Sequence, residues 1–341
     1  MGVVGLLMCA TGAAAGTPTV EDAPVYGAQL EGFDYPYPVH RFEFESQASA
    51  MQMAYLDVAA PVPNGRTVVL LHGKNFCAAT WEPTISALAQ AGFRVVAPDQ
   101  IGFCKSTKPQ RYQYSFHQLA ANTVALLDAL GVQRFVLVGH STGGMLAIRL
   151  ALQFPHRLEQ LVLVNPVGLE DAQAQGVPAP SVDAWYRREL GVTAQRLRQY
   201  EQATYYAGQW RAEFDAPVQM LAGMYRGPGR DLVAWNSALL YDMIFTQPVV
   251  YELERIAVPT LMMMGQHDTT AIGRDFAPPP LAATLGDMPG LARRAVARIP
   301  HATLVEFADA GHAPQLQDPV AFNRVLLQGL SGTDPQRAAP R

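Results

Sequence analysis

Short apolar runs alternate with longer amphipathic segments along most of this chain. Strands are predicted where aliphatic and β-branched residues run together, and helices where apolar residues recur every three or four positions. Buried strands are expected at Thr67–Leu71, Arg94–Pro98, Phe135–Val138, Leu161–Val164, Thr260–Met264 and Thr303–Phe307. Helices are expected at Trp81–Ala91, Phe116–Leu130, Met145–Phe154 and Val320–Leu330. This alternation predicts an α/β fold, a doubly wound and mostly parallel sheet with helices on both faces.

The segments before the first buried strand have a different pattern. Residues 17–38 are rich in proline, glycine and acidic residues, so we expect an irregular leader there. Polar and apolar residues alternate in Val39–Gln47 and in Met51–Val58, which predicts a pair of strands near one edge of the sheet.

One long insertion interrupts the alternation. Residues 170–254 contain no strand-like apolar run and are dense in helix-forming and aromatic residues. Because the insertion lies between two predicted strands, it is expected to form a helical cap over the edge where those strands end. Most of its aromatic side chains should form the cap's own small core, and a minority should face a pocket. The core that carries the sheet is then residues 39–169 and 255–333.

The two ends of the chain lie outside this pattern. Residues 1–16 combine a short apolar run with a stretch of small residues, which predicts a secretory signal peptide, although no Lys or Arg precedes the run. The protein is therefore expected to be secreted or periplasmic, and otherwise cytoplasmic. Residues 334–341 are expected to form a disordered tail.

The composition excludes several classes of protein. The chain has 341 residues, of which 49% are hydrophobic and 16% charged, as in globular proteins with a sizeable core. Its formal net charge is −4 and it has no basic run, so neither nucleic acid nor an anionic membrane is an expected partner. The apolar run near the N-terminus is too short to span a bilayer.

The clearest chemical motif is Gly139-His140-Ser141-Thr142-Gly143. It follows an apolar strand and precedes a helix, and strand, tight turn and helix together are the context of a nucleophile elbow. Such a turn strains the serine backbone and demands residues without bulk two positions to either side, which Gly139 and Gly143 provide. We therefore predict that Ser141 is a nucleophile.

A serine hydroxyl needs a base within hydrogen-bond reach and an acid that orients the base. The candidate base is His312, after the last predicted strand, and the candidate acid is Asp268, after the strand ending at Met264. All three groups follow strand ends, which meet at one edge of a parallel sheet. His267, next to Asp268, is an alternative base. Asn165 follows another strand, at a second position where the acid could lie, but its amide side chain cannot act as an acid.

The loops beside the nucleophile supply two further expectations. The backbone N–H groups of Thr142 and Lys74 are expected to form an oxyanion hole, with the Lys74 side chain facing solvent or adding a positive charge to the pocket. Cys77 and Cys104 fall on loops after adjacent strands. They are either two buried thiols or, in an exported protein, a disulfide that braces the active-site edge.

Several of these motifs together resemble the α/β-hydrolase superfamily. They are Leu71-His72-Gly73, Pro98-Asp99 with Gly102 and Ser106, Gly139 to Gly144, Asp268 and Gly311-His312. The similarity extends from Val39 to Leu330 and is greatest to the capped branch of esterases, cofactor-free haloperoxidase-like enzymes and C–C hydrolases. One departure is Cys104, which replaces the second glycine of the family's Asp-x-x-Gly-x-Gly-x-Ser.

The resemblance implies a Ser-His-Asp hydrolase that acts through an acyl-enzyme, with no cofactor and no metal. The leading hypothesis is a carboxylic-ester hydrolase acting on a moderately bulky apolar small-molecule ester, as a monomer or homodimer. Cleavage of an amide or a C–C bond by the same triad is the first alternative. A non-catalytic receptor that uses the capped cavity is the second.

Overall fold

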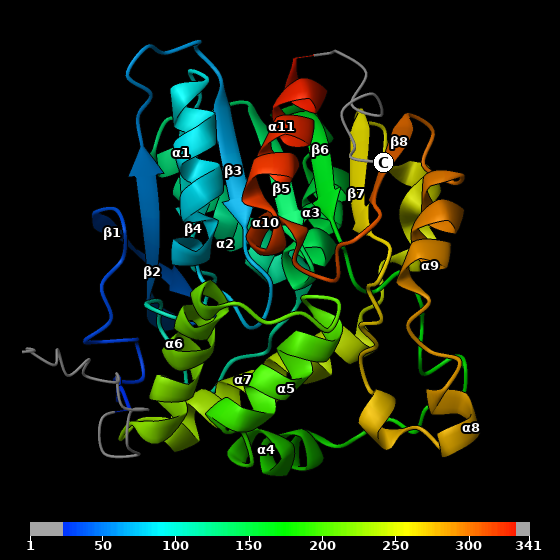
Figure 1. Cartoon of the computed structure of the whole chain (residues 1–341). Helices are drawn as coiled ribbons and strands as arrows, with labels where there is room; N and C mark the ends of the chain where they lie inside the picture. The colour runs from blue at the N-terminus through cyan, green and yellow to red at the C-terminus, as the bar shows by residue number, and fades with distance from the viewer. Residues whose placement is uncertain (1–22, 332–341) are drawn as a thin grey trace, which may run out of the picture.

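The computed structural model describes residues 23–331, so the predicted signal peptide (1–16) and tail (334–341) lie outside the described residues. One sheet contains eight strands in the order β1-β2-β4-β3-β5-β6-β7-β8 (Figure 1). The strands are β1 (Val39–Ser46), β2 (Ser49–Val58), β3 (Thr67–Leu71), β4 (Arg94–Pro98), β5 (Phe135–His140), β6 (Leu158–Val164), β7 (Thr260–Gly265) and β8 (Ala302–Phe307).

All strand pairs from β4 to β8 are parallel, and β2 alone runs in the opposite direction, pairing antiparallel with both β1 and β4. The predicted α/β fold is thus confirmed. Strand order reverses direction around β3, which lies between β4 and β5. In open parallel sheets ligands bind beyond the carboxyl ends of the strands at such a reversal. The loops after β3 and β5 are therefore the expected place for a site.

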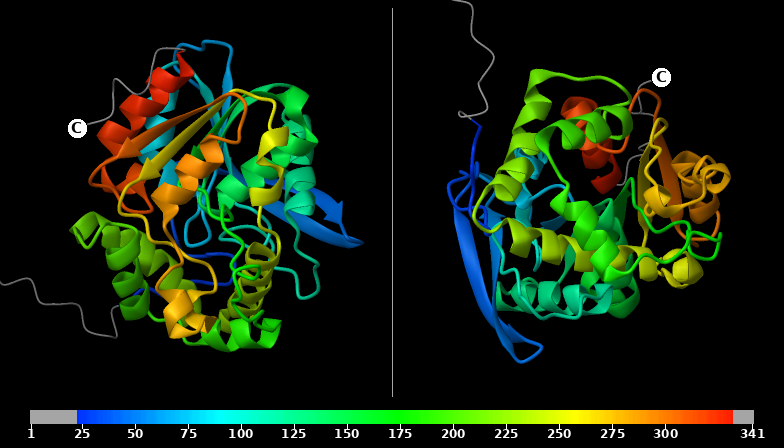
Figure 2. Two further views of the ribbon diagram at one scale, coloured as in Figure 1. Left: turned by 90° about the vertical axis from the view of Figure 1, so that its right-hand side faces the viewer. Right: turned by 90° about the horizontal axis from the view of Figure 1, so that it is seen from below.

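Helices cover both faces of the sheet (Figure 2). They are α1 (Glu82–Gln90), α2 (Phe116–Ala129), α3 (Thr142–Gln153), α9 (Met288–Val296), α10 (Pro314–Gln317) and α11 (Pro319–Leu330). The short helix α8 (Pro279–Ala282) lies away from the sheet, beside the cap (Figure 1). Alternate residues of β3 divide between the two apolar cores: Val68 and Leu70 pack with α1 and α11, whereas Val69 and Leu71 pack with α2 and α3. This alternation is the period-two geometry of a strand buried on both faces.

Four helices fill the insertion between β6 and β7 and lie beneath the carboxyl edge of the sheet in Figure 1. They are α4 (Val182–Leu190), α5 (Ala194–Thr204), α6 (Asp215–Arg226) and α7 (Arg230–Thr246). Aromatic side chains pack within them: Trp185 stacks on Tyr241 with ring centroids 4.9 Å apart, and Tyr206 stacks on Phe214. The insertion thus has small apolar cores of its own.

The described part of the leader, residues 23–38, has no helix or strand, yet it packs closely. Tyr26 N–H donates to the Gly223 carbonyl of α6, and the Tyr35 hydroxyl donates to Asp99 after β4. This segment therefore joins the cap to the core.

The sequence pattern missed the helix α9. Pro289 and Gly290 obscured its start, although proline is favourable in the first turn of a helix and the Asp287 side chain caps the Gly290 N–H. The helix expected from Trp81 begins at Glu82, after a short 3₁₀ turn at Ala78–Trp81.

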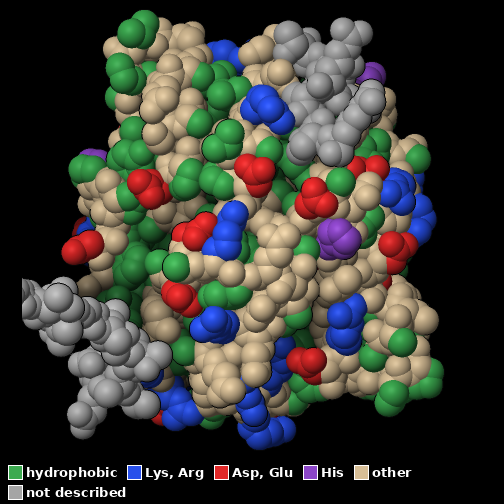
Figure 3. Space-filling model, viewed as in Figure 1, with side chains coloured by type: hydrophobic (Ala, Val, Ile, Leu, Met, Phe, Trp, Pro, Cys, Tyr) green, Lys and Arg blue, Asp and Glu red, His purple; other side chains and the backbone are tan. Residues whose placement is uncertain are grey.

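Within residues 23–331 no helix combines the length and apolar character needed to cross a membrane. The face shown in Figure 3 carries acidic and basic side chains interspersed, without a large area of one sign.

Candidate active site

Ser141 lies in the turn between β5 and α3 with a strained backbone. Its φ of 55° is positive, which is rare for a residue with a side chain. A Cβ atom at Gly139 would collide with the Gly143 carbonyl, and one at Gly143 would collide with the carbonyl of Leu71. The two glycines therefore permit the close approach that the elbow requires, as the sequence predicts.

The three predicted triad side chains converge beyond the strand ends. His312 Nε2 is 2.8 Å from Ser141 Oγ, and His312 Nδ1 is 2.7 Å from Asp268 Oδ2. All three residues are buried, with Ser141 retaining 6% exposure. Both separations are hydrogen-bond distances, so the hydroxyl, imidazole and carboxylate form a continuous chain.

The surroundings of Asp268 keep its carboxyl ionised. Burial alone would raise the pKa of Asp268, but the His312 imidazole and hydrogen bonds from His312, Asn165 and Thr270 outweigh burial and hold that pKa below its ordinary value. An ionised carboxylate only accepts hydrogen bonds, so His312 Nδ1–H donates to it. Nε2 of the neutral imidazole is then free to accept the Ser141 proton.

Asn165 is a supporting residue whose role the sequence did not indicate. It follows β6 with a positive φ of 42°, and its Nδ2 donates to Asp268 Oδ2 at 2.8 Å. The Thr270 N–H donates to the other carboxylate oxygen at 2.9 Å. Both Asp268 oxygens are therefore fixed. The position of Asn165 after a strand end was the only signal in the sequence, and that position does not reveal which group the side chain would contact.

The remaining histidines near the site are structural or exposed. His140 is buried behind the triad, where its Nε2–H donates to the His312 carbonyl at 2.8 Å. Burial and the neighbouring His312 lower the pKa of His140 to about 3, so it stays neutral. His72 accepts from the Gln100 N–H at Nε2 and donates to the Gly73 carbonyl from Nδ1–H, so both of its ring nitrogens are bonded to backbone. His267, the alternative base, is exposed.

The loop after β3 approaches the nucleophile closely. A Cβ atom on Gly73 would lie 3.0 Å from Ser141 Cβ and 2.8 Å from His140 Nδ1. The next residue is Lys74, and the backbone N–H groups of Lys74 and Thr142 donate no hydrogen bond to any group within residues 23–331. Two donors thus flank Ser141 from different elements, as an oxyanion hole requires.

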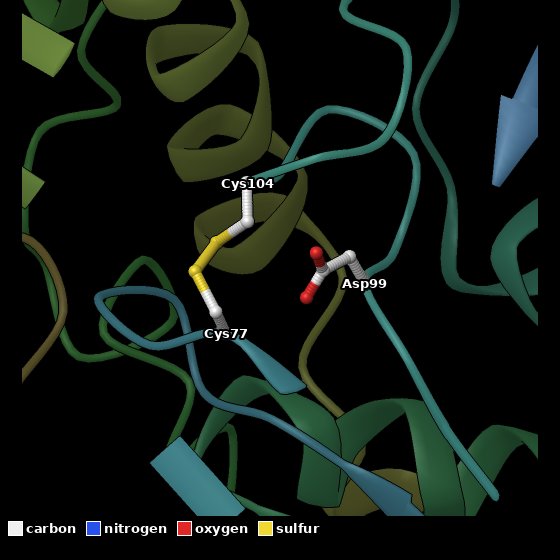
Figure 4. A group of neighbouring side chains, drawn as sticks. All are labelled: Cys77, Asp99 and Cys104. Atoms are coloured by element: carbon white, nitrogen blue, oxygen red, sulfur yellow. A yellow bond between two sulfur atoms is a disulfide. The ribbon is translucent and has the colours of Figure 1, made fainter. Parts of the chain in front are cut away.

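Cys77 and Cys104 form a disulfide with their Cα atoms 5.9 Å apart (Figure 4). The Asp99 carboxylate lies beside the bridge and accepts from the Ala78 and Lys105 N–H groups. Cys104 has a φ of 39°, so it adopts the left-handed conformation that glycine usually supplies at this place in the loop. Sulfur in a disulfide is not a thiolate ligand, so these three side chains cross-link two loops rather than chelate a metal.

Residues 66–319 match the family model of the alpha/beta hydrolase fold. The match covers most of the chain and includes all three triad residues. The chain belongs to the α/β-hydrolase family.

Individual relatives agree that this α/β-hydrolase is a hydrolytic enzyme. A crystal structure described as a probable hydrolytic enzyme from Pseudomonas aeruginosa PAO1 is 64% identical, covers 90% of this chain and 99% of its own, and has a TM-score of 0.90. A candidate carbamate hydrolase, RutD, of Stutzerimonas stutzeri is 28% identical over 81% of this chain and 96% of its own. The 2-hydroxy-6-oxo-2,4-heptadienoate hydrolase of Pseudomonas putida is 36% identical over 34% of this chain and 42% of its own.

Of the two orientations considered for the Lys74 side chain, the structure shows the one in which it faces the cap and not solvent. Its Nζ donates to Ser237 Oγ at 2.7 Å and lies 3.5 Å from Glu189 Oε2, and the side chain is 12% exposed. Glu189 and Ser237 are on the cap helices α4 and α7, 115 and 163 residues away in the sequence. Contacts between residues so far apart leave no local pattern in the sequence, so this placement of Lys74 could not be predicted.

A cavity of about 270 Å³ lies between this loop and the cap. Lys74 and Asn75 form its wall on the core side. The cap side combines aliphatic and aromatic residues with ionisable ones: Arg188, Glu189, Val192, Arg196, Leu197, Tyr200, Leu221, Tyr225 and Tyr241. The lining is therefore mixed. It includes three aromatic side chains of the cap, in keeping with the expectation that a minority of them face a pocket, and Ser141 and His312 are not among the lining residues.

Proposed function

We propose that this α/β-hydrolase cleaves carboxylic esters of small molecules through an acyl-enzyme. The observation that supports this most strongly is the continuous chain from Ser141 Oγ through His312 to Asp268, with separations of 2.8 and 2.7 Å. Ester hydrolysis is the simplest reaction for such a chain, because an alkoxide or phenoxide leaves more readily than an amide anion or a carbanion.

In the first half of the reaction Ser141 Oγ attacks the ester carbonyl while its proton passes to His312 Nε2. The carbonyl oxygen becomes an oxyanion, which the N–H groups of Thr142 and Lys74 stabilise. The imidazolium then protonates the leaving alcohol as the C–O bond breaks, and Asp268 stabilises the positive charge. In the second half water attacks the acyl-enzyme, His312 takes the water proton and returns it to Ser141, and the acid is released.

The mixed lining of the cavity refines the expected substrate. Apolar walls from Leu197 and Leu221 suit a compact aliphatic or aromatic group. Polar groups line the same space: Arg188 is paired there with Glu189 and Asp275, and Arg196 adds a second guanidinium. The cavity of about 270 Å³ is lined by Lys74 and Asn75 but not by Ser141, so it would receive only the part of a small ester that lies away from the scissile bond. We therefore favour compact esters with a polar substituent over long, purely apolar ones.

The test is hydrolysis of short-chain nitrophenyl esters by the wild type and by Ser141→Ala. Wild-type turnover and loss of at least 10³-fold in the variant are expected, in line with triad residues elsewhere. Equal rates for the two proteins would remove the proposal.

Carbamate or C–C bond cleavage by the same triad is the second candidate. It is favoured by the names of two relatives, a candidate carbamate hydrolase and a heptadienoate hydrolase. Comparing kcat/KM for an ester, a carbamate, an anilide and a vinylogous diketone of similar size distinguishes the candidates, because the ester must be the best substrate if the first proposal holds.

We also propose that residues 1–16 direct export. The disulfide between Cys77 and Cys104 supports this, since disulfides persist mainly in oxidising compartments. Expression of the full chain in a bacterium, followed by fractionation and N-terminal sequencing, tests it. An uncleaved protein confined to the cytoplasm would contradict export.

A further inference from the structure

The loop that carries the Lys74 N–H is fastened to the cap through its own side chain. Lys74 Nζ donates to Ser237 Oγ, lies 3.5 Å from Glu189 Oε2 and sits 3.8 Å from the centroid of the Tyr241 ring. Ser237 in turn donates to Glu189, and Tyr225 donates to the same carboxylate oxygen at 2.7 Å. We name Lys74, Glu189, Ser237 and Tyr225 the Lys74 tether.

Glu189 is the centre of this tether. Its side chain is 3% exposed, and its second oxygen, Oε1, accepts from Arg188 at 3.0 Å. Burial alone would raise the pKa of Glu189, but Lys74, the Ser237 hydrogen bond and Arg188 outweigh burial and hold that pKa below its ordinary value. The carboxylate therefore stays ionised at neutral pH and keeps its hold on Lys74.

The stability of the fold does not by itself explain a buried ion pair of this kind. Desolvation of two charges offsets most of their attraction, and apolar residues of similar volume commonly stabilise a protein as well. What an ion pair with several hydrogen bonds adds is a defined geometry. Here the geometry is imposed on a loop whose preceding residue, Gly73, has no side chain of its own to anchor it.

The cap also contacts the other catalytic loop. The N–H of His312 donates to the Thr204 carbonyl at the end of α5, and the Ala313 N–H donates to the Tyr205 carbonyl. A Cβ atom at Gly311 would lie 2.6 Å from that Tyr205 carbonyl oxygen, so glycine permits the contact. The cap is thus bonded to the loops on both sides of Ser141.

We propose that Glu189 is a positioning residue, which fixes the Lys74 backbone N–H in the oxyanion hole by holding the Lys74 side chain against the cap. This inference deepens the proposed function and rests on it. An oxyanion donor must lie within tenths of an ångström of its place, because its benefit comes from being oriented before charge develops. Without the Glu189 carboxylate, the loop gains freedom and the donor stabilises the transition state less.

The experiment compares Glu189→Gln with Glu201→Gln in the full-length enzyme. Glu201 is a matched control, because it is also a buried glutamate of the cap but its carboxylate makes no hydrogen bond to Lys74, the triad or any other group within residues 23–331. For a nitrophenyl ester, Glu189→Gln is expected to lower kcat by about 10- to 100-fold, less than the loss of a whole oxyanion donor, with KM changed less than threefold. Glu201→Gln is expected to keep kcat within twofold.

A second readout separates positioning from general loosening of the cap. Ser141 adds to the carbonyl of a trifluoromethyl ketone that carries the same acyl group, and the resulting adduct bears an oxyanion. The inhibition constant of this ketone for Glu189→Gln must therefore rise by the same factor by which kcat falls. Should Glu189→Gln fold poorly, Ser237→Ala removes one link of the tether at lower cost and is expected to show the same pattern, at roughly threefold to tenfold.

The outcomes are distinct. Wild-type kcat in folded Glu189→Gln, a loss of kcat without weaker ketone binding, or an equal loss in Glu201→Gln would each overturn the positioning role while leaving Ser141-dependent hydrolysis intact. Absence of any Ser141-dependent turnover in the wild type would overturn the proposed function and this inference with it.

Discussion

A buried carboxyl in the cap should make the stability of this enzyme fall as pH rises. Glu201, on α5, is 0% exposed, and neither of its carboxylate oxygens has a hydrogen-bond partner within residues 23–331. The phenol groups of Tyr205 and Tyr206 interact with it electrostatically and bring no positive charge. Burial therefore raises the pKa of Glu201 from 4.5 to about 8.

The sign and size of the effect follow from proton linkage. The folded state holds the Glu201 proton up to about pH 8, whereas the unfolded chain releases it near 4.5. Between these values the unfolded state binds fewer protons, so the free energy of unfolding decreases as pH rises. At 1.36 kcal/mol per pH unit, this one group lowers the unfolding free energy by about 3 kcal/mol between roughly pH 5 and pH 7.5. That is a large part of a typical domain's stability.

Urea unfolding of the wild type and of Glu201→Gln at both pH values measures the effect. Because the amide cannot ionise, the decrease in unfolding free energy between the two pH values should be about 3 kcal/mol smaller in the variant than in the wild type. All other groups titrate alike in both proteins, so their contributions cancel in this comparison. Glu45→Gln, at an exposed position of β1, should behave like the wild type. If Glu201→Gln keeps the wild-type pH dependence to within about 1 kcal/mol, the reasoning from burial is refuted.

Three further variants test the site and its bracing. Asp268→Asn should lower kcat by about 10³- to 10⁴-fold in a steady-state ester assay, because an amide cannot hold the tautomer and charge of His312; a loss below tenfold argues against the triad. Asn165→Ala should lower kcat roughly tenfold in the same assay through loss of its hydrogen bond to Asp268, and unchanged kcat would assign it no such role. Replacing Cys77 and Cys104 by alanine opens a loop of sequence separation 27 and should lower the urea unfolding free energy by about 3.5 kcal/mol, so equal stability contradicts a bracing role.

The sheet and the elbow could be predicted because their signals are local. Strands buried on both faces must be apolar throughout, as β3 and β5 are, and the turn at Ser141 must be flanked by residues without bulk. The order of Ser141, Asp268 and His312 along the chain then follows from strand ends meeting at one edge. These features need no knowledge of which distant side chains meet.

The parts that could not be predicted depend on the tertiary placement of polar side chains. A glutamate or lysine is solvated in most proteins, so nothing in the sequence indicates that Glu189 and Glu201 are buried or that Lys74 is mostly covered by the cap. The role of Asn165 depends on Asp268, 103 residues later. The Cys77–Cys104 bridge lies between these cases, since the strand order places its two loops side by side but does not decide whether the thiols are joined.

The central claim is that Ser141 is the nucleophile of a working triad, and the attachment site of a fluorophosphonate probe tests it most directly. The wild type should gain the mass of one probe on the peptide that contains Ser141. His312→Ala should react at least 10²-fold more slowly, because the hydroxyl then lacks its base. A wild-type protein that stays unlabelled, or that carries the probe on a different residue, would contradict the account.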